Sequence, residues 1–545
     1  MKTNLEIEQG IEKLPITEVV RMLGLDPDSI NLHGKYIAKL PLSILHERAE
    51  RPDGKLILVT AVTPTRSGEG KTTVAISLSD ALTRLRQKTT LCLREPSGGP
   101  YFGMKGGATG GGYAQVTPAE DINLHFTGDM YGVSKANNLL ASMIDNHLYF
   151  GNPLQIDSRR VTWKRVIDLN DRALRDIIIG LGGTSNGFPR RDGFDITPAS
   201  EVMTILSLAM DPSDLHDRLK RIVVGYTHQG EPVTCAQLKA DSAMVILLRD
   251  TIQPNLVQTL GHSPAIIHGG AFANIAHGCN TLFATTMALK LADYVVTEAG
   301  FGSDLGAEKF FDIKCRTAGL QPNAAVIVAT VRALKHHGDG SLEEGFANLA
   351  KHIENIRCFG VSPVVAINRF DADTDDELLA VQRHCEASGV PAAVCDGFNS
   401  GGAGAEELAR VVMKVAGDGS SSLRFLYPLD LPIKEKMETI ATKMYGAAGV
   451  EYDRKALASI EQIERLGLGN LPVCVAKTQA SLSDRSELKG APRDFTITVN
   501  DVRLSAGAGL VVMLCGSIMT MPGLPRVSAA ELMQVDSDGQ TITLA

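Results

Sequence analysis

The sequence predicts an α/β protein built on a mostly parallel sheet, because short apolar runs alternate with longer amphipathic stretches. The clearest apolar runs are rich in β-branched residues and lie at positions 56–62, 90–93, 294–297, 325–329 and 363–367. Continuous apolar runs of this length are typical of strands covered on both faces. Their alternation with helix-length segments favours parallel strands joined by helices.

The segments outside these runs are expected to form helices and a few further strands. Residues 11–25 and 43–51 are predicted to form helices at the edge of the core, and residues 405–416 a later helix. The C-terminal part changes to helices followed by strand-like segments at 495–502 and 540–544.

Charged or glycine-rich stretches at 336–345 and 417–422 are candidate linkers. We therefore expect two smaller additional domains beside the sheet core. The predicted modules are an α/β core at 1–345, a smaller α/β domain at 346–430 and a C-terminal α+β domain at 431–545.

Composition and charge exclude several classes of protein. Of the 545 residues, 44% are hydrophobic and 21% charged, and the net charge of −8 is spread along the chain. Nucleic-acid binding would need Lys and Arg clustered on one face. No apolar stretch approaches the roughly 20 residues of a membrane helix. With nine scattered cysteines and no C-x-x-C pair, we expect a soluble, cytoplasmic protein with reduced thiols.

A glycine-rich loop follows the first strand in the arrangement that binds phosphate. The strand at 56–62 runs into residues 63–73, which end in Gly-Lys-Thr-Thr before a helix-like segment. Glycines let backbone N–H groups face phosphate oxygens, the lysine adds a cation, and the threonine hydroxyl binds Mg²⁺. The nucleotide-binding candidates, with Thr72 as the Mg²⁺ ligand, are Thr65, Arg66, Ser67, Gly68, Glu69, Gly70, Lys71 and Thr72.

This loop predicts that the sheet core is P-loop NTPase-like. One departure is that Thr65 stands where the usual pattern has its first glycine. The alternative is a glycine-rich turn that merely starts a helix.

A second candidate loop follows the strand at 90–93. Ligands of open α/β sheets lie beyond the carboxyl ends of the strands, so Arg94 and Glu95 are expected to border the phosphate loop. Arg94 can grip a phosphoryl or carboxylate oxygen in a bidentate fork, and Glu95 can orient it or help to hold the metal. A surface ion pair is the competing interpretation for both residues.

The segment from 102 to 129 is rich in glycine and then in polar residues. The glycines at 103–112 favour close approach to an anion or to another chain segment, although a floppy loop is the alternative. Alternation at 121–129 predicts an extended segment with Asn123, His125 and Thr127 on one face. His125 is a candidate for orienting a substrate or transferring a proton, and a structural histidine is the alternative.

Two further strands lead into loops that are expected at the same edge of the sheet. The strand at 294–297 is followed by Glu298, Phe301 and Asp304. Phe301 is a candidate for binding the nucleotide or the second substrate, and the carboxylates are candidates for Mg²⁺ or water, or for caps. Phe370 follows the strand at 363–367, and Phe398 lies further on. Two such rings can hold a flat heteroaromatic ring between them, although phenylalanines are also common in cores.

Taken together, these segments resemble formate–tetrahydrofolate ligases. Matching pieces include Leu-Arg-Glu-Pro-Ser and Asp-Ile-Asn-Leu-His-Phe-Thr-Gly-Asp, and they lie at 63–72, 93–97, 102–115, 120–129, 255–259, 272–280, 297–309, 476–479 and 503–509. The similarity covers nearly the whole chain, which makes it far more specific than the phosphate loop alone.

The resemblance implies ATP, formate and tetrahydrofolate as substrates, formyl phosphate as intermediate and a homotetramer as the assembly. It implies that residues matching Lys71 and Arg94 meet the phosphates and formyl phosphate, with Glu95 beside them. It also implies that Phe370 and Phe398 hold the folate ring, so the 346–430 domain contributes to the folate pocket. A monovalent cation is a further candidate ligand, for which the sequence indicates no site.

Some positions depart from the pattern expected of this family. Phe398 stands where tryptophan is usual, and Arg66 and Ser67 stand where Pro-Ala is usual. Gly98 and Ala480 are two further departures. Replacing tryptophan by phenylalanine removes stacking area, so weaker folate binding is a hypothesis.

The expected activity is ATP-dependent ligation of formate to tetrahydrofolate, giving 10-formyltetrahydrofolate, ADP and phosphate. Two alternatives stay open at this point. One is a regulatory P-loop ATPase that hydrolyses ATP to switch conformation. The other is a folate-binding homologue with weakened activity, which the departures around Phe398 would permit.

Overall fold

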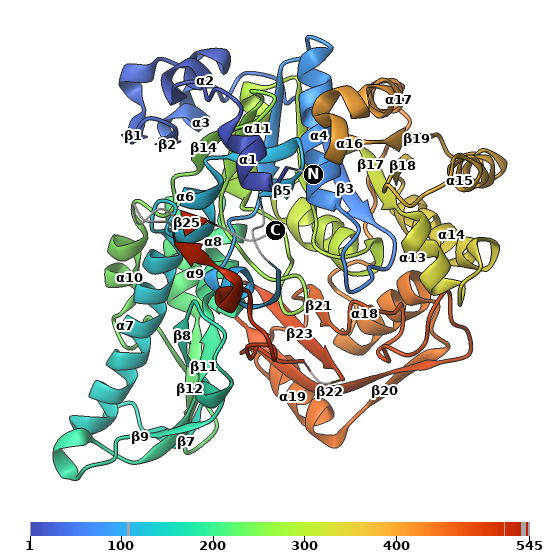
Figure 1. The fold of residues 1–545 in the computed structure, drawn as a ribbon. Helices are drawn as coiled ribbons and strands as arrows, with labels where there is room; N and C mark the ends of the chain where they lie inside the picture. The colour runs from blue at the N-terminus through green and yellow to red at the C-terminus, as the bar shows by residue number, and fades with distance from the viewer. Residues whose placement is uncertain (1, 106–108, 517, 536–540, 543–545) are drawn as a thin grey trace.

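We analysed a computed structural model of the chain, which describes residues 2–105, 109–516, 518–535 and 541–542. A large sheet crosses the molecule, helices cover both of its faces, and a long lobe projects to the lower left of Figure 1. A smaller sheet near the C-terminus lies at the lower right, beside helices that cover the large sheet.

The five apolar runs of the sequence all form strands of the large sheet, as predicted. They are β3 (Lys55–Ala61), β4 (Thr89–Leu93), β16 (Tyr294–Glu298), β17 (Pro322–Ala329) and β18 (Pro363–Asn368). With β15 (Pro264–Ile267) and β19 (Ala392–Cys395) they run in the order β15-β4-β16-β3-β17-β18-β19, and every neighbouring pair is parallel. The predicted α/β class and the mostly parallel sheet are therefore confirmed.

The other edge of the large sheet is antiparallel. Its strands are β14 (Asn255–Thr259), β2 (Ile37–Lys39) and β1 (Asn31–His33), while β6 (Ala114–Thr117) and β5 (Gly110–Gly111) branch from β14. This edge comes from short segments without a long apolar run, so the sequence pattern did not reveal it.

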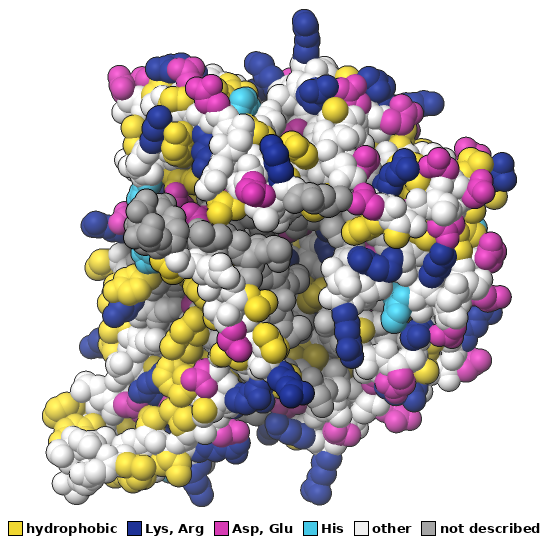
Figure 2. Space-filling model, in the orientation of Figure 1, with side chains coloured by type: hydrophobic (Ala, Val, Ile, Leu, Met, Phe, Trp, Pro, Cys, Tyr) yellow, Lys and Arg dark blue, Asp and Glu magenta, His cyan; other side chains and the backbone are white. Residues whose placement is uncertain are grey.

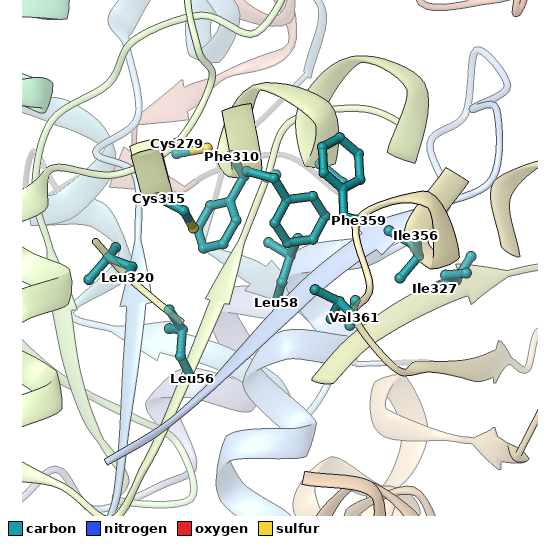
Figure 3. Close-up of a cluster of buried hydrophobic side chains, with 14 of the residues drawn as sticks. Leu56, Leu58, Cys279, Phe310, Cys315, Leu320, Ile327, Ile356, Phe359 and Val361 are labelled. Carbon is teal, nitrogen blue, oxygen red and sulfur yellow. The ribbon is translucent and has the colours of Figure 1, made fainter. Parts of the chain in front are cut away.

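Alternation along β3 divides the core into two layers. Ile57 and Val59 pack with the apolar faces of α4 (Lys71–Arg84) and α17 (Glu406–Gly417). Leu56 and Leu58 point to the opposite face, where α11 (Leu282–Leu291) and α14 (Leu342–Cys358) lie. Figure 3 shows this second layer, in which Phe310, Phe359 and Ile356 close over Leu58.

The other helices are short or lie at the edges of the sheet. The predicted helix at 11–25 is restricted to α2 because Pro15 precedes its first turn, and the one at 43–51 ends early. These helices are α1 (Asn4–Gln9), α2 (Ile16–Met22), α3 (Ser43–Glu47), α5 (Gly98–Pro100), α6 (Ala119–Leu124), α12 (Arg316–Ala318), α13 (Val331–His337), α15 (Asp375–Ala387) and α16 (Gly397–Ser400).

The projecting lobe has its own apolar core, which the sequence analysis did not anticipate. Its strands are only three to six residues long, too short for a clear alternation. The lobe consists of α7 (Asp129–Tyr149), β7 (Ile156–Val161), β8 (Arg165–Ile167), β9 (Ile177–Ile179), β10 (Arg190–Asp192), β11 (Phe194–Ile196), α8 (Glu201–Leu208), α9 (Pro212–Arg221), β12 (Val223–Thr227), β13 (Pro232–Thr234) and α10 (Asp241–Leu248).

The C-terminal part forms a four-stranded sheet in the order β20-β22-β23-β21. Its elements are α18 (Ile433–Ile440), β20 (Gly449–Tyr452), α19 (Arg454–Arg465), β21 (Val473–Ala476), β22 (Thr496–Ser505) and β23 (Leu510–Cys515). Val511 and Met513 of β23 join the core that contains Phe310, whereas Val512 and Leu514 join the core of the lobe. The two faces of this sheet thus bind it to the rest of the molecule.

The predicted module boundary at 345 falls within a helix of the structure. The strands β18 and β19 extend the large sheet, and residues 345 and 346 lie within the single helix α14. The predicted tail strand at 540–544 corresponds to β25 (Thr541–Ile542), which pairs with β24 (Gln534–Val535), and its other residues lie outside the described ones. The division at 345 and 430 stays a prediction.

Among the residues that the structure describes, no helix combines the length and the apolar character needed to cross a bilayer. In Figure 2, acidic and basic side chains are mixed over the upper part of the visible face, and apolar side chains gather over the lobe.

A buried ion pair ties the C-terminal sheet to the large sheet. Lys477, which follows β21, lies 2.8 Å from Asp304, which follows β16, and their side chains are 0% and 2% exposed. We predict that Asp304→Ala lowers the free energy of unfolding by about 3–5 kcal/mol, because it leaves the Lys477 charge buried and unpaired.

Urea unfolding followed by circular dichroism measures this loss. The matched control is Lys455→Ala, which removes an ion pair with Asp501 whose lysine is 73% exposed, and it should cost about 0–1 kcal/mol. Equal losses in the two variants would contradict the assigned role of the buried pair.

Candidate functional site

The predicted phosphate loop joins β3 to α4, so the expected strand–loop–helix context is confirmed. Gly68 and Gly70 have φ of 73° and 72°, a left-handed conformation that favours glycine. Gly70 caps α4, and a Cβ on it would stand 2.4 Å from Nδ2 of Asn368. Lys71 and Thr72 open the helix, whose N-terminus favours an anion. Arg66 and Ser67 are exposed.

Glu69 braces this loop from within. The backbone N–H and the hydroxyl of Thr65 each donate to its Oε1 over 2.7 Å, and the hydroxyl of Thr330 donates to its Oε2 over 2.5 Å. Asn368 donates to its backbone carbonyl over 3.0 Å. The carboxylate of Glu69 therefore holds the loop in shape. Thr65 contributes to this by donating two of the hydrogen bonds.

The hydroxyl of Thr72 donates to Oε2 of Glu298 over 2.9 Å. Glu298 is the last residue of β16, the parallel neighbour of β3. A P-loop hydroxyl beside a carboxylate at the next strand end is the oxygen pair that holds Mg²⁺ in P-loop enzymes. No group of three or more His, Cys, Asp or Glu side chains suited to a metal occurs among the described residues.

Arg94 follows β4, on the other side of β16. Its Nη1 donates to the carbonyl of Ala271 over 3.2 Å and lies 3.5 Å from the point where a Cβ on Gly300 would stand. Its Nε is buried without a hydrogen-bond partner among the described residues. Because Thr72 contacts Glu298 and Arg94 lies beside Gly300, the short segment from the last residue of β16 to Gly300 borders both predicted loops.

Glu95 is 6% exposed and surrounded by other acids. Burial raises the pKa of its carboxyl well above the ordinary value, the negative charges of Asp129 and Asp168 raise it further, and Lys39 opposes them. Its Oε2 has no hydrogen-bond partner among the described residues. The environment favours the neutral acid, which can donate a hydrogen bond but is a poor metal ligand.

The prediction of an extended segment around His125 was wrong. Residues Ala119–Leu124 form α6, which starts after Pro118 with Glu120 and Asp121 in its first turn, and these local helix signals outweigh the alternation. His125 caps this helix and is exposed. No hydrogen bond joins it to the phosphate loop or to Arg94 among the described residues, so its catalytic role stays a prediction.

The loop at 271–280 brings a histidine that the sequence analysis did not assign. Burial lowers the pKa of His277 well below its ordinary value, and Lys314, Lys309 and Arg94 lower it further. Neither ring nitrogen has a hydrogen-bond partner among the described residues. Lys309 holds this loop through the carbonyls of Ala273 and Ala276, at 2.6 and 3.3 Å. The signal available in the sequence was the position of His277 in a glycine-bearing stretch that follows the apolar run at 264–267.

The predicted aromatic positions lie at neighbouring strand ends. Phe370 follows β18, Phe398 follows β19 and is 42% exposed, and Asn399 donates to Asp371 over 3.2 Å between the two loops. The two rings are not in contact with each other in the described structure. Phe301 follows β16 with a φ of 63°, a strained value for a phenylalanine.

Close packing explains one of the glycines in the glycine-rich segment. A Cβ on Gly112 would stand 2.0 Å from the carbonyl oxygen of Phe398, and Tyr113 donates its N–H to that oxygen over 2.9 Å. Close approach of another chain segment is therefore the reason for glycine here. The glycines at 106 and 107 lie outside the described residues.

Together, these strand-end loops define an α/β protein with a phosphate-type loop, an arginine and an acid at one edge of a parallel sheet. Residues 2–545 match the sequence model of the formate–tetrahydrofolate ligase family. A formate–tetrahydrofolate ligase from Granulibacter bethesdensis is 54% identical over 550 residues, covering 99% of this chain and 96% of that protein. The chain belongs to the formate–tetrahydrofolate ligase family.

The Thr72–Glu298 pair leads to a prediction about Mg²⁺. Thr72→Val should weaken binding of Mg²⁺ to the ATP-loaded protein by about tenfold or more, because it removes one of the two oxygens and leaves Glu298 without its donor. Titration with Mn²⁺ in the presence of ATP, followed by electron paramagnetic resonance, measures this affinity without turnover.

Thr72→Ser is the matched control, because it keeps the hydroxyl, and it should bind Mn²⁺ like the native protein. Unchanged Mn²⁺ affinity in Thr72→Val would show that the hydroxyl does not contribute to the metal site.

Proposed function

We propose that this chain ligates formate to tetrahydrofolate at the expense of ATP, through formyl phosphate, and releases 10-formyltetrahydrofolate, ADP and phosphate. Membership in the formate–tetrahydrofolate ligase family supports this activity. The observation that carries the proposed site is the segment Glu298–Gly300, which binds the hydroxyl of Thr72 on one side and has Arg94 beside it on the other. The regulatory ATPase and the weakened homologue are not favoured.

The first step that we propose is phosphoryl transfer to formate. A carboxylate oxygen of formate attacks the γ-phosphorus of ATP, the bond to the bridging oxygen breaks, and ADP leaves. Catalysis of such a step is mainly alignment and neutralisation of charge. The N–H groups after Gly68 and the cation of Lys71 would hold the phosphates, and Arg94 would grip the transferred group. Bound Mg²⁺ would supply further positive charge beside Thr72.

The second step is attack of the folate N10 lone pair on the formyl carbon. The bond from this carbon to the phosphate oxygen breaks, and the proton of the nitrogen passes to the phosphate that leaves. Burial raises the pKa of Glu95 and lowers the pKa of His277. A carboxyl that stays protonated would not repel anionic substrates at this edge of the sheet. We propose Phe370 and Phe398 as the two walls of the folate site, with the loops after β18 and β19 joined by the Asn399–Asp371 bond.

The positions of these residues suggest a role for each of the three predicted modules. Residues 1–345 would bind nucleotide and formate, residues 346–430 would contribute to the folate site, and residues 431–545 would support both through the small C-terminal sheet.

Lys71→Ala tests the nucleotide half of the site. We expect this variant to retain the native circular dichroism spectrum and to lose about 10²–10³-fold in kcat, because a donor to the transferred charge is removed. A coupled assay for 10-formyltetrahydrofolate, with ATP, formate or tetrahydrofolate omitted in turn, should require all three in the native protein.

The matched control is Lys88→Ala, an exposed lysine at the opposite end of β4, which should keep native activity. ATP hydrolysis by the native protein without formate or tetrahydrofolate at the full rate would instead support a regulatory ATPase. Native activity in Lys71→Ala would contradict the site.

We further propose that the chain assembles as a homotetramer and that the tip of the lobe is one of its contact surfaces. Apolar side chains gather on this tip in Figure 2. The exposed fractions are 72% for Phe150, 62% for Phe188, 63% for Ile178 and 62% for Leu181. Large exposed apolar surfaces are rare on monomeric proteins and mark interaction sites.

The double variant Phe150→Ser, Phe188→Ser should therefore form smaller assemblies than the native tetramer. Sedimentation velocity at micromolar concentration measures the change. Leu379→Ser, which alters an exposed leucine on α15, is the matched control and should sediment like the native protein. A native monomer, or a double variant that stays tetrameric, would contradict this surface.

A further inference from the structure

Arg332 links the phosphate loop to the aromatic wall of the proposed folate site. It is the second residue of α13, directly after β17, and β17 lies between β3 and β18 in the sheet. The strand order therefore places Arg332 between the loop that carries Gly68 and the loop that carries Phe370. Among the described residues, no other arginine has a hydrogen bond, ion pair or ring contact with both loops.

The first contact of Arg332 is with the phosphate loop. Its Nη2 donates to the carbonyl oxygen of Gly68 over 2.6 Å and lies 3.9 Å from Oε2 of Glu69. The peptide between Gly68 and Glu69 is trans and planar, so its N–H points away from its carbonyl. By holding the carbonyl on its own side, Arg332 directs the N–H of Glu69 to the other side of the peptide. Orientation of such N–H groups is what determines phosphate binding by a loop of this kind.

The second contact is with the ring of Phe370. The guanidinium carbon of Arg332 lies 4.6 Å from the ring centroid, which is a cation–π distance. Because the guanidinium covers one face of the ring, a flat ligand can stack only on the opposite face. Phe370 is also held by its backbone N–H, which donates to Asp373 over 2.8 Å. A movement of Arg332 therefore changes the support of the ring.

The stability of the fold does not account for this arrangement. The side chain of Arg332 is 41% exposed, and exposed charge pairs contribute about 0–1 kcal/mol to folding. Its two contacts instead connect the phosphate loop at Gly68 with the separate loop that carries Phe370. Phosphate binding that fixes the Gly68 peptide would fix the guanidinium, and this would in turn fix the ring.

We propose that Arg332 is a positioning residue that couples the binding of ATP to the binding of tetrahydrofolate. This inference rests on the proposed function, because it takes Phe370 as a wall of the folate site. Coupling between two sites is reciprocal, so ATP strengthens the binding of tetrahydrofolate by the same factor as tetrahydrofolate strengthens that of ATP. With formate omitted, no formyl phosphate forms, and both affinities are measurable at equilibrium.

The test compares the Kd of tetrahydrofolate with and without saturating ATP and Mg²⁺, measured by isothermal titration calorimetry on the full chain. In the native protein, ATP should lower this Kd by about fivefold or more, the lower end of typical coupling factors. In Arg332→Gln the factor should fall to about one to two, because the amide is too short and uncharged to span both contacts. The Kd of ATP with and without tetrahydrofolate should give the same factors.

A second variant keeps the phosphate loop intact. Phe370→Leu retains the bond from Arg332 to Gly68 but removes the ring, so it should also reduce the factor to about one to two, whatever its effect on the Kd of tetrahydrofolate alone. The matched control is Arg369→Gln, which alters a neighbouring arginine paired with Asp375 and away from Gly68. This control should keep the native factor.

Each outcome decides between the two proposals. A native protein that forms 10-formyltetrahydrofolate but shows no coupling, or coupling that survives in Arg332→Gln or Phe370→Leu, would overturn the role of Arg332 alone. A native protein that does not bind tetrahydrofolate at all would instead overturn the proposed function.

Discussion

The parallel alignment of β4, β16 and β3 is the constraint on which the rest of the site depends. Parallel neighbours end at the same edge of a sheet, so three loops that are far apart in the sequence meet there. The middle strand, β16, supplies the shared wall, because Glu298 contacts Thr72 and Gly300 lies against Arg94. A change of register by β16 would separate the phosphate loop from the arginine.

At this edge of the sheet, buried charged side chains hold the backbone of the loops in place through hydrogen bonds. Glu69 accepts three hydrogen bonds from Thr65 and Thr330, and Lys309 donates to two carbonyls of the loop next to Arg94. A buried charge is costly unless it is paired or hydrogen-bonded. Such groups therefore fix the loops in one conformation, which lets the exposed groups of the site meet their substrates without large rearrangement. Arg332 differs in being partly exposed and in joining two loops.

The sequence predicted the strands of the sheet because continuous apolar runs leave few alternatives, and it placed Lys71, Thr72 and Arg94 at one edge through the order of strand and loop. It did not predict the lobe, whose strands are short, or the antiparallel edge. Around His125, alternation favoured an extended segment, but Pro118 and the acids that follow it start a helix. Glu69 shows that a motif alone does not determine what a side chain contacts. A motif places a residue in a loop, but only packing decides whether its side chain faces the ligand or braces the backbone. Arg332 belongs to no motif, and only the strand order brings it beside Gly68 and Phe370.

The central claim is that formate is phosphorylated between the loops of Lys71 and Arg94 before its carbon is transferred. Formate labelled with ¹⁸O in both oxygens tests it directly. If a formate oxygen attacks the γ-phosphorus, that oxygen stays on phosphorus when the formyl group moves to tetrahydrofolate. Mass spectrometry of the released phosphate should therefore find one ¹⁸O atom per phosphate formed. Phosphate that carries no label from formate, while labelled 10-formyltetrahydrofolate accumulates, would contradict the account.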